Sequence, residues 1–84
     1  MEKSIYSPEY ELLLEVLRTL RIESGVTQVE LAARLKQSQS YVSKVERGDR
    51  RLDLVQLRTI CLTLGSTLPE FVEAFEQRLK ERGL

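Results

Sequence analysis

The sequence predicts an all-α domain of five helices joined by short connections. Apolar residues recur at intervals of three and four along most of the chain, as on the buried face of a helix. No window shows the strict apolar and polar alternation that indicates a half-buried strand. Helix-start signals divide the chain into five segments, at Ser7-Pro8, Thr27, Ser38, Asp53 and Thr67. With 84 residues, of which 42% are hydrophobic, one packed domain over residues 1–84 is expected.

The first helix should begin at Ser7-Pro8, because serine caps a helix and proline suits its first position. Gly25 is expected to end it. An apolar stripe should face the core from this helix, formed by Leu13, Leu17 and Leu20.

Two short helices are expected next, at about residues 28–36 and 39–47. Thr27 and Glu30 form a capping box for the first, and Ser38 caps the second. Gly48 should end the second helix. The side chains expected to face inward are Leu31, Ala32, Leu35, Val42 and Val45.

The last two helices also carry start signals. Asp53 and Gln56 form a second capping box, and Gly65 closes that helix. Its buried face is predicted to hold Leu54, Leu57, Ile60 and Leu64. A final helix over about residues 68–82 opens at Thr67-Leu68-Pro69 and carries Phe71, Val72, Phe75 and Leu79.

Composition argues against several function classes. The chain has one cysteine and no histidine, so neither an internal disulfide nor a structural zinc site is expected. Cys61 is interpreted as a small buried apolar residue. There is no glycine-rich phosphate loop, and the carboxylates are spread along helix surfaces, so we expect no enzyme, no cofactor and no small-molecule ligand. Without a long apolar run or a signal peptide, a cytoplasmic protein with no membrane partner is expected.

The two short helices form a compact pair, at about residues 27–47, that suits a helix-turn-helix motif. In such a pair the first helix braces the second, which enters the major groove of DNA. The helix at 39–47 leaves polar side chains outward, namely Gln39, Ser40, Ser43 and Lys44. Glutamine pairs with adenine and lysine with the acceptors of guanine, although most polar helix faces are only solvated.

Positive charge is concentrated on the same segment. Residues 28–51 hold six basic and three acidic side chains, net +3, whereas the whole chain is neutral with 13 of each. The basic side chains are Arg34, Lys36, Lys44, Arg47, Arg50 and Arg51. Phosphate contacts supply affinity for DNA, so this coincidence favours DNA binding over an ordinary solvated loop.

Three stretches together resemble the Cro/repressor (XRE-like) helix-turn-helix family: TQVELA at 27–32, SQSYVSK at 38–44 and ERG at 46–48. The similarity extends over about residues 13–75. The resemblance implies a five-helix, lambda-repressor-like domain. It also implies a sequence-specific transcriptional regulator, a repressor or controller, encoded by a bacterium or phage and bound to a double-stranded DNA operator.

The resemblance also implies roles for individual residues. The family's base-reading positions correspond to Gln39, Ser40, Ser43 and Lys44, and its backbone-contacting positions to Arg47, Arg50 and Arg51. Gln28 would face a phosphate from the start of its helix, and Tyr41 would touch either the DNA backbone or a thymine methyl. Gln28 would also brace Gln39, and Arg21 would form a buried ion pair with Glu46. Two departures from the family are Lys36, where glycine is usual, and a loop after Gly48 that lacks proline. A left-handed lysine costs about 1 kcal/mol.

A homodimer formed through the C-terminal helix is expected, because the chain has more apolar residues than one small core needs. In the first helix Leu12, Leu14 and Val16 accompany the predicted stripe, and the last helix adds the four apolar residues named above, with Leu62 leaning outward nearby. The competing interpretation is internal packing of the last helix against Ile5, Tyr6 and Tyr10.

A rival function is a protein-interaction module that keeps the fold without binding DNA. Among regulators, the roles of phage repressor, restriction-modification controller, antitoxin and regulator of its own operon all remain open.

Overall fold

The computed structural model describes residues 7–84, and these form five α-helices and no strand. The helices are α1 (Pro8–Glu23), α2 (Gln28–Leu35), α3 (Gln39–Arg47), α4 (Leu54–Thr63) and α5 (Leu68–Glu81). The all-α prediction is confirmed, and each helix lies within two residues of its predicted bounds. The predicted contacts of Ile5 and Tyr6 lie outside the described residues.

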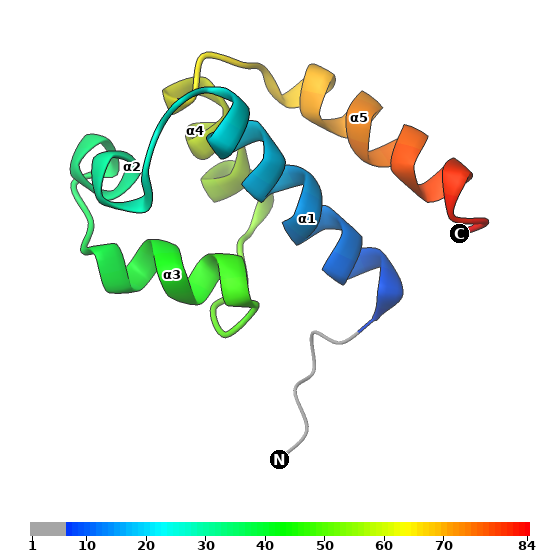
Figure 1. The fold of residues 1–84 in the computed structure, drawn as a ribbon, viewed down its shortest axis with the longest axis horizontal. Helices are drawn as coiled ribbons and strands as arrows, with labels where there is room; N and C mark the ends of the chain where they lie inside the picture. Colours follow the sequence, from blue (N-terminus) through cyan, green and yellow to red (C-terminus); the bar gives the residue numbers. More distant parts are fainter. Residues whose placement is uncertain (1–6) are drawn as a thin grey trace.

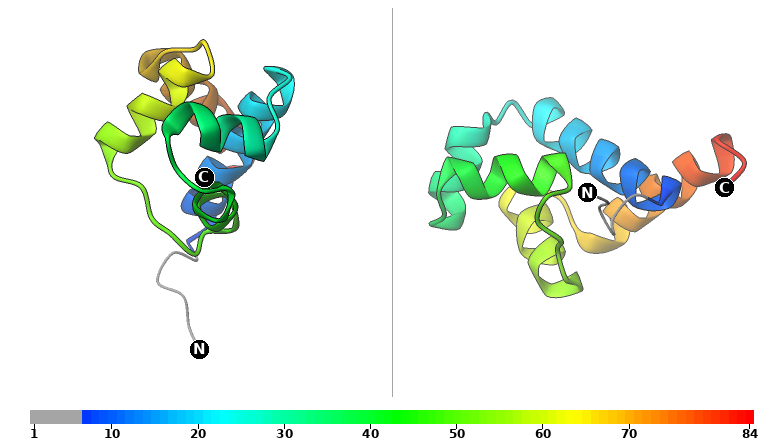
Figure 2. Two further views of the ribbon diagram at one scale, coloured as in Figure 1. Left: turned by 90° about the vertical axis from the view of Figure 1, so that its left-hand side faces the viewer. Right: turned by 90° about the horizontal axis from the view of Figure 1, so that it is seen from below.

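Helix α1 crosses the middle of the molecule, with α2 and α3 on one side and α5 running alongside it on the other (Figure 1). The two further views show the same arrangement, with α4 packed behind the helix pair and against α5 (Figure 2). Because α1 lies between α3 and α5, it must bury apolar side chains on two sides. The structure accordingly buries Leu12, Leu14, Val16 and Leu17 within a single chain.

This burial corrects two expectations. Leu13 and Leu20 are only half-buried, so the stripe predicted for α1 is not its most buried face. The apolar surplus of α1 is used inside the chain, so it is no argument for a second copy. Of the residues in the competing interpretation, only Tyr10 is described, and its hydroxyl contacts the loop after α3.

Side-chain caps set the helix starts, as predicted. The hydroxyls of Ser7, Thr27, Ser38 and Thr67 and the carboxylate of Asp53 each accept a hydrogen bond from a backbone N–H three residues on. Both predicted capping boxes are present. In the first, a hydrogen bond from the backbone N–H of Thr27 lowers the pKa of Glu30.

One continuous core joins the five helices. Val42 and Val45 from α3 meet Ile60 and Cys61 from α4 there, and Phe71 anchors α5. Cys61 is fully buried, as predicted, and burial raises the pKa of its thiol. The prediction for Leu54 is wrong: its side chain is 65% exposed, because it stands in the first turn of α4, ahead of the part that reaches the core.

Candidate nucleic-acid interface

Helices α2 and α3 are joined by three residues, and the turn between them depends on Lys36. Lys36 adopts the left-handed conformation, with φ 58° and ψ 42°, and is the only non-glycine residue with positive φ in the described chain. Its backbone N–H donates to Ala33, and the next N–H donates to Ala32. The left-handed residue therefore closes α2 and lets α3 start at once from the Ser38 cap.

The outward face of α3 carries the predicted base-reading residues. Gln39, Ser40 and Lys44 are exposed, whereas Ser43 is half-buried beneath Arg47. On the opposite face Val42 and Val45 are buried in the core. Burial of the apolar face of α3 therefore directs its polar face outward. The polar face includes all four candidate positions.

A buried polar network fixes how α3 sits against the rest of the fold. Arg21 of α1 donates from Nε and Nη2 to the two carboxylate oxygens of Glu46, at 2.6 and 3.1 Å. Arg21 Nη1 also donates to the carbonyl of Val26, at 2.9 Å. The ion pair implied by the family resemblance is therefore present, in the bidentate geometry that arginine and carboxylate favour.

Gln28 extends this network to the predicted base-reading residues of α3. Its Nε2 donates to Glu46 Oε1 at 2.9 Å, and its Oε1 accepts from Gln39 Nε2 at 3.5 Å. A chain of polar contacts therefore runs from Arg21 inside the fold, through Glu46 and Gln28, to the exposed start of α3. The contact between Gln28 and Glu46 was not predicted, because nothing local to either residue indicates it.

The loop after α3 is held by its own backbone. The N–H groups of Asp49 and Arg50 both donate to the carbonyl of Lys44, at 2.8 and 3.1 Å, and Gly48 stands in the left-handed conformation. Arg47, at the end of α3, donates to Ser43 Oγ at 2.6 Å and to Asp49 Oδ2 at 3.1 Å. The sequence indicated neither partner of Arg47.

The two other loop arginines stack on aromatic rings. The guanidinium carbon of Arg50 lies 5.1 Å from the ring centre of Tyr41, and that of Arg51 lies 4.7 Å from the ring centre of Tyr10. Tyr41 was predicted to touch DNA directly, whereas here its ring also supports a cation. Tyr10 was not predicted to belong to the site, because it precedes the motif by 17 residues of sequence.

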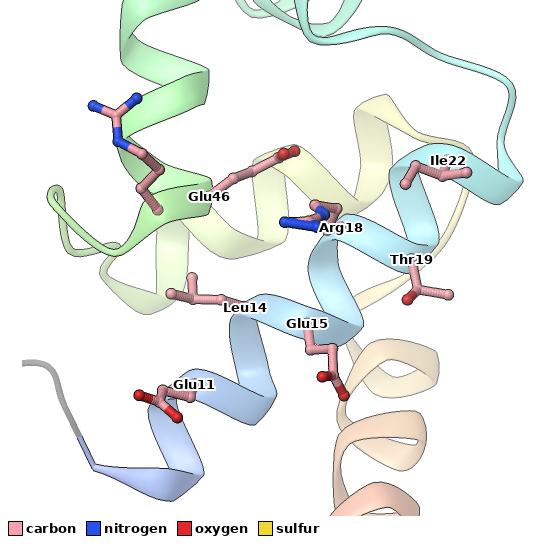
Figure 3. Close-up of a pocket in the computed structure, with 8 residues that line it drawn as sticks. Glu11, Leu14, Glu15, Arg18, Thr19, Ile22 and Glu46 are labelled. Carbon is pink, nitrogen blue, oxygen red and sulfur yellow. The ribbon is translucent and has the colours of Figure 1, made fainter.

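Beside the α2–α3 helix pair, a hollow of about 520 Å³ lies between α1 and α3. In Figure 3, Glu46 and Arg18 extend into the space between these helices, whereas Glu15 points toward α5. The hollow is lined by both acidic and basic side chains, so no single sign of charge is available there to select a ligand. Residues 7–84 also contain no cluster of three metal-binding side chains.

None of the helices in the described range is long and apolar enough to cross a membrane.

Residues 17–71 match the model of the family described as Helix-turn-helix, and this range includes α2, α3 and the loop after them. Among curated proteins, the chain is similar to the HTH-type transcriptional regulator y4dJ of Sinorhizobium fredii (strain NGR234). The two are 42% identical over 53 residues, which are 63% of this chain and 69% of that protein.

Solved structures with this fold include an XRE-family like protein from Pseudomonas syringae pv. tomato, with 38% identity and a TM-score of 0.78 over 83% of this chain and 85% of that one. The clp gene regulator ClgR from Corynebacterium glutamicum has 29% identity and a TM-score of 0.76, covering 87% and 78%. The restriction-modification controller protein C.Esp1396I has 27% identity and a TM-score of 0.81, covering 89% and 97%.

Proposed function

This chain belongs to the helix-turn-helix family of XRE-type transcriptional regulators, and from that membership we propose that it reads a specific operator with α3. Members of this family are DNA-binding regulators and not enzymes. In the proposal, Gln39, Ser40, Ser43 and Lys44 contact base edges in the major groove. The DNA backbone is met by Gln28, Tyr41, Arg47, Arg50 and Arg51.

The observation that carries the proposal is that the outward side chains of α3 make few contacts in the absence of DNA. Ser40 and Lys44 are exposed and make no side-chain hydrogen bond within residues 7–84, and Gln39 makes only one long contact. Beneath them, the network through Gln28 and Glu46 holds the helix in one orientation. Free donors on a fixed helix are what groove recognition requires, because little ordering is left to be done on binding.

The experiment is selection of bound sequences from a random duplex pool, followed by titration of the selected site. Gln39→Ala and Lys44→Ala should each weaken binding to that site by about 1–3 kcal/mol and relax the preference at particular base pairs. Arg58→Ala is the matched control, because it removes an exposed positive charge from α4.

Two outcomes would contradict the proposal. If neither variant changes the sequence preference, α3 is not the reading helix. If the wild-type chain shows no salt-sensitive binding to any duplex, the chain is an interaction module instead.

We further propose that the regulator acts as a homodimer through α5 and the neighbouring face of α4. Apolar side chains remain exposed there, with Leu62 at 47% and Val72 at 41%. Phe75 packs partly against the core and serves this interface less than those two. A two-fold dimer would place its reading helices about 34 Å apart, on a roughly palindromic site.

Light scattering at micromolar concentration tests the dimer. The wild-type chain should have twice the monomer mass, and Val72→Glu or Leu62→Glu should shift the mass toward the monomer. Val29→Glu is the control, since Val29 is also an exposed apolar residue, at 58%, but lies on α2. A monomeric mass for the wild-type chain would refute the dimer and leave the reading helix unaffected.

A further inference from the structure

Tyr10, in the first turns of α1, contacts the loop after α3 in two ways. Its ring lies under the guanidinium of Arg51, with 4.7 Å between the guanidinium carbon and the ring centre. Its hydroxyl accepts a hydrogen bond from the backbone N–H of Leu52, at 3.4 Å. One side chain on α1 therefore holds both an arginine of the loop and the backbone beside it, across 42 residues of sequence.

The geometry leaves Arg51 ready to bind an anion. Stacking on a ring uses the flat face of a guanidinium, whereas its N–H donors point outward in the plane. Arg51 is exposed, and in residues 7–84 its guanidinium makes no hydrogen bond. Arg47 differs, because Ser43 and Asp49 already accept from two of its nitrogens. Arg50 and Arg51 are therefore the loop cations that a ring supports and whose guanidinium groups make no hydrogen bond within residues 7–84, and only Arg51 is supported from α1.

We propose that Tyr10 is a positioning residue for DNA binding, which holds Arg51 and the backbone at Leu52 so that the guanidinium meets a phosphate. The inference rests on the proposed function and extends the interface to α1, outside the helix-turn-helix motif. A preorganised side chain loses less rotamer freedom when it binds, so the stacked arginine binds a phosphate more tightly than a mobile one. Tyr41 supports Arg50 in the same way from α3.

A double-mutant cycle on DNA affinity tests whether Tyr10 acts through Arg51. Tyr10→Leu should weaken binding to the selected operator and to random duplex by similar factors of about three to ten, because the Arg51 side chain would then have to be immobilised on binding. In an Arg51→Ala background the same change should cost less than about twofold. In an Arg50→Ala background, the matched control, the full loss should remain.

The salt slope separates positioning from a merely structural role. Tyr10→Leu and Arg51→Ala should each reduce the slope of log K against log salt by about 1, because one phosphate contact is lost. Tyr10→Phe keeps the ring and should keep the wild-type slope. A Tyr10→Leu chain that melts at a lower temperature but keeps the wild-type slope would overturn the proposal, as would equal losses of affinity in all three backgrounds.

Arg51→Lys gives a result even if Tyr10→Leu does not fold. The variant keeps the charge at an exposed position but removes the flat group that stacks, so binding should fall by at least about twofold. Wild-type affinity in this variant would overturn the positioning role. If the wild-type chain binds no DNA, both the proposed function and this inference are wrong. If it binds DNA and the cycle shows no coupling, only the role of Tyr10 is wrong.

Discussion

Helix α1 makes two junctions with arginine–carboxylate contacts, and they differ in burial. At the junction with α3, Arg21 and Glu46 have side chains only 12% and 4% exposed. At the junction with α5, Glu15 meets Arg78 and Arg82 at 3.1 and 2.9 Å, and these three side chains are 50%, 32% and 54% exposed. The chemical groups are the same, but water competes for them at only one junction.

The difference shows that buried polar contacts specify the orientation of α3 on α1 but not the orientation of α5. Removing one partner of a buried ion pair leaves an uncompensated charge, whereas exposed pairs are screened and contribute little. The α3 junction therefore tolerates one geometry, and that geometry reaches the reading face through Gln28. The α5 junction depends on apolar burial, with Phe71 as its anchor. The buried polar contacts therefore fix α3, the helix that is proposed to read DNA.

Arg21→Ala should have the largest effect and would break the α3 junction. It leaves the Glu46 carboxylate buried without its cation, so unfolding free energy should fall by about 3–5 kcal/mol. Thermal and urea denaturation measure the loss. Arg18→Ala is the matched control, because Arg18 lies on the same helix, is exposed and has no hydrogen-bond partner within the described chain. A melting temperature equal to that of the wild-type chain would mean that this junction does not depend on the ion pair.

Gln28→Ala should sharpen the comparison, because it removes the link between the buried pair and the reading face. Glu46 keeps Arg21 but loses one hydrogen bond to its carboxylate, so we expect a loss of about 1.5–3 kcal/mol in unfolding free energy. Operator affinity should fall further than this loss of stability explains. Gln77→Ala, at an exposed position of α5, should change neither the unfolding free energy nor the operator affinity. Full operator affinity in a destabilised Gln28→Ala chain would show that the network supports the fold alone.

The fold was predictable where the determining signals are local. Each cap, such as Ser38 or Asp53, satisfies a backbone N–H three residues away, so a short window contains both partners. The left-handed Lys36 was implied by the family resemblance instead, because Lys36 stands where glycine is usual. Leu54 was predicted wrongly, since periodicity gives the face of a helix but not how far along it the core extends.

The site was predictable only in part. The family resemblance implied the contact of Arg21 with Glu46, which the structure contains. It did not imply that Arg51 stacks on Tyr10 or that Arg47 binds Asp49. These contacts depend on the backbone conformation of the loop after α3. Loop geometry depends on backbone contacts such as Arg50 to Lys44, which carry no side-chain signal.

Asp49→Ala tests an exposed pair that lies on the proposed DNA-binding surface. The Arg47–Asp49 pair is 57% and 30% exposed, so its removal should change unfolding free energy by less than about 1 kcal/mol. Affinity for random duplex should instead rise by about two- to fivefold, because a carboxylate near phosphates is lost and the Nε–H of Arg47 no longer donates to it. Fluorescence anisotropy at two salt concentrations measures this. A weaker complex would show that Asp49 holds Arg47 in its binding position.

Glu15→Ala should have the smallest effect and bears on the α5 junction. The change removes the carboxylate that Arg78 and Arg82 share, but all three groups already contact water. We expect a loss of about 0.2–1 kcal/mol at low salt, which should vanish near 0.5 M salt because screening shortens to a few ångströms. Denaturation at both salt concentrations measures it, with exposed Glu11→Ala as the control. A loss as large as that of Arg21→Ala, and insensitive to salt, would mean that α5 is also held by its charges. The contrast between the two junctions would then fail.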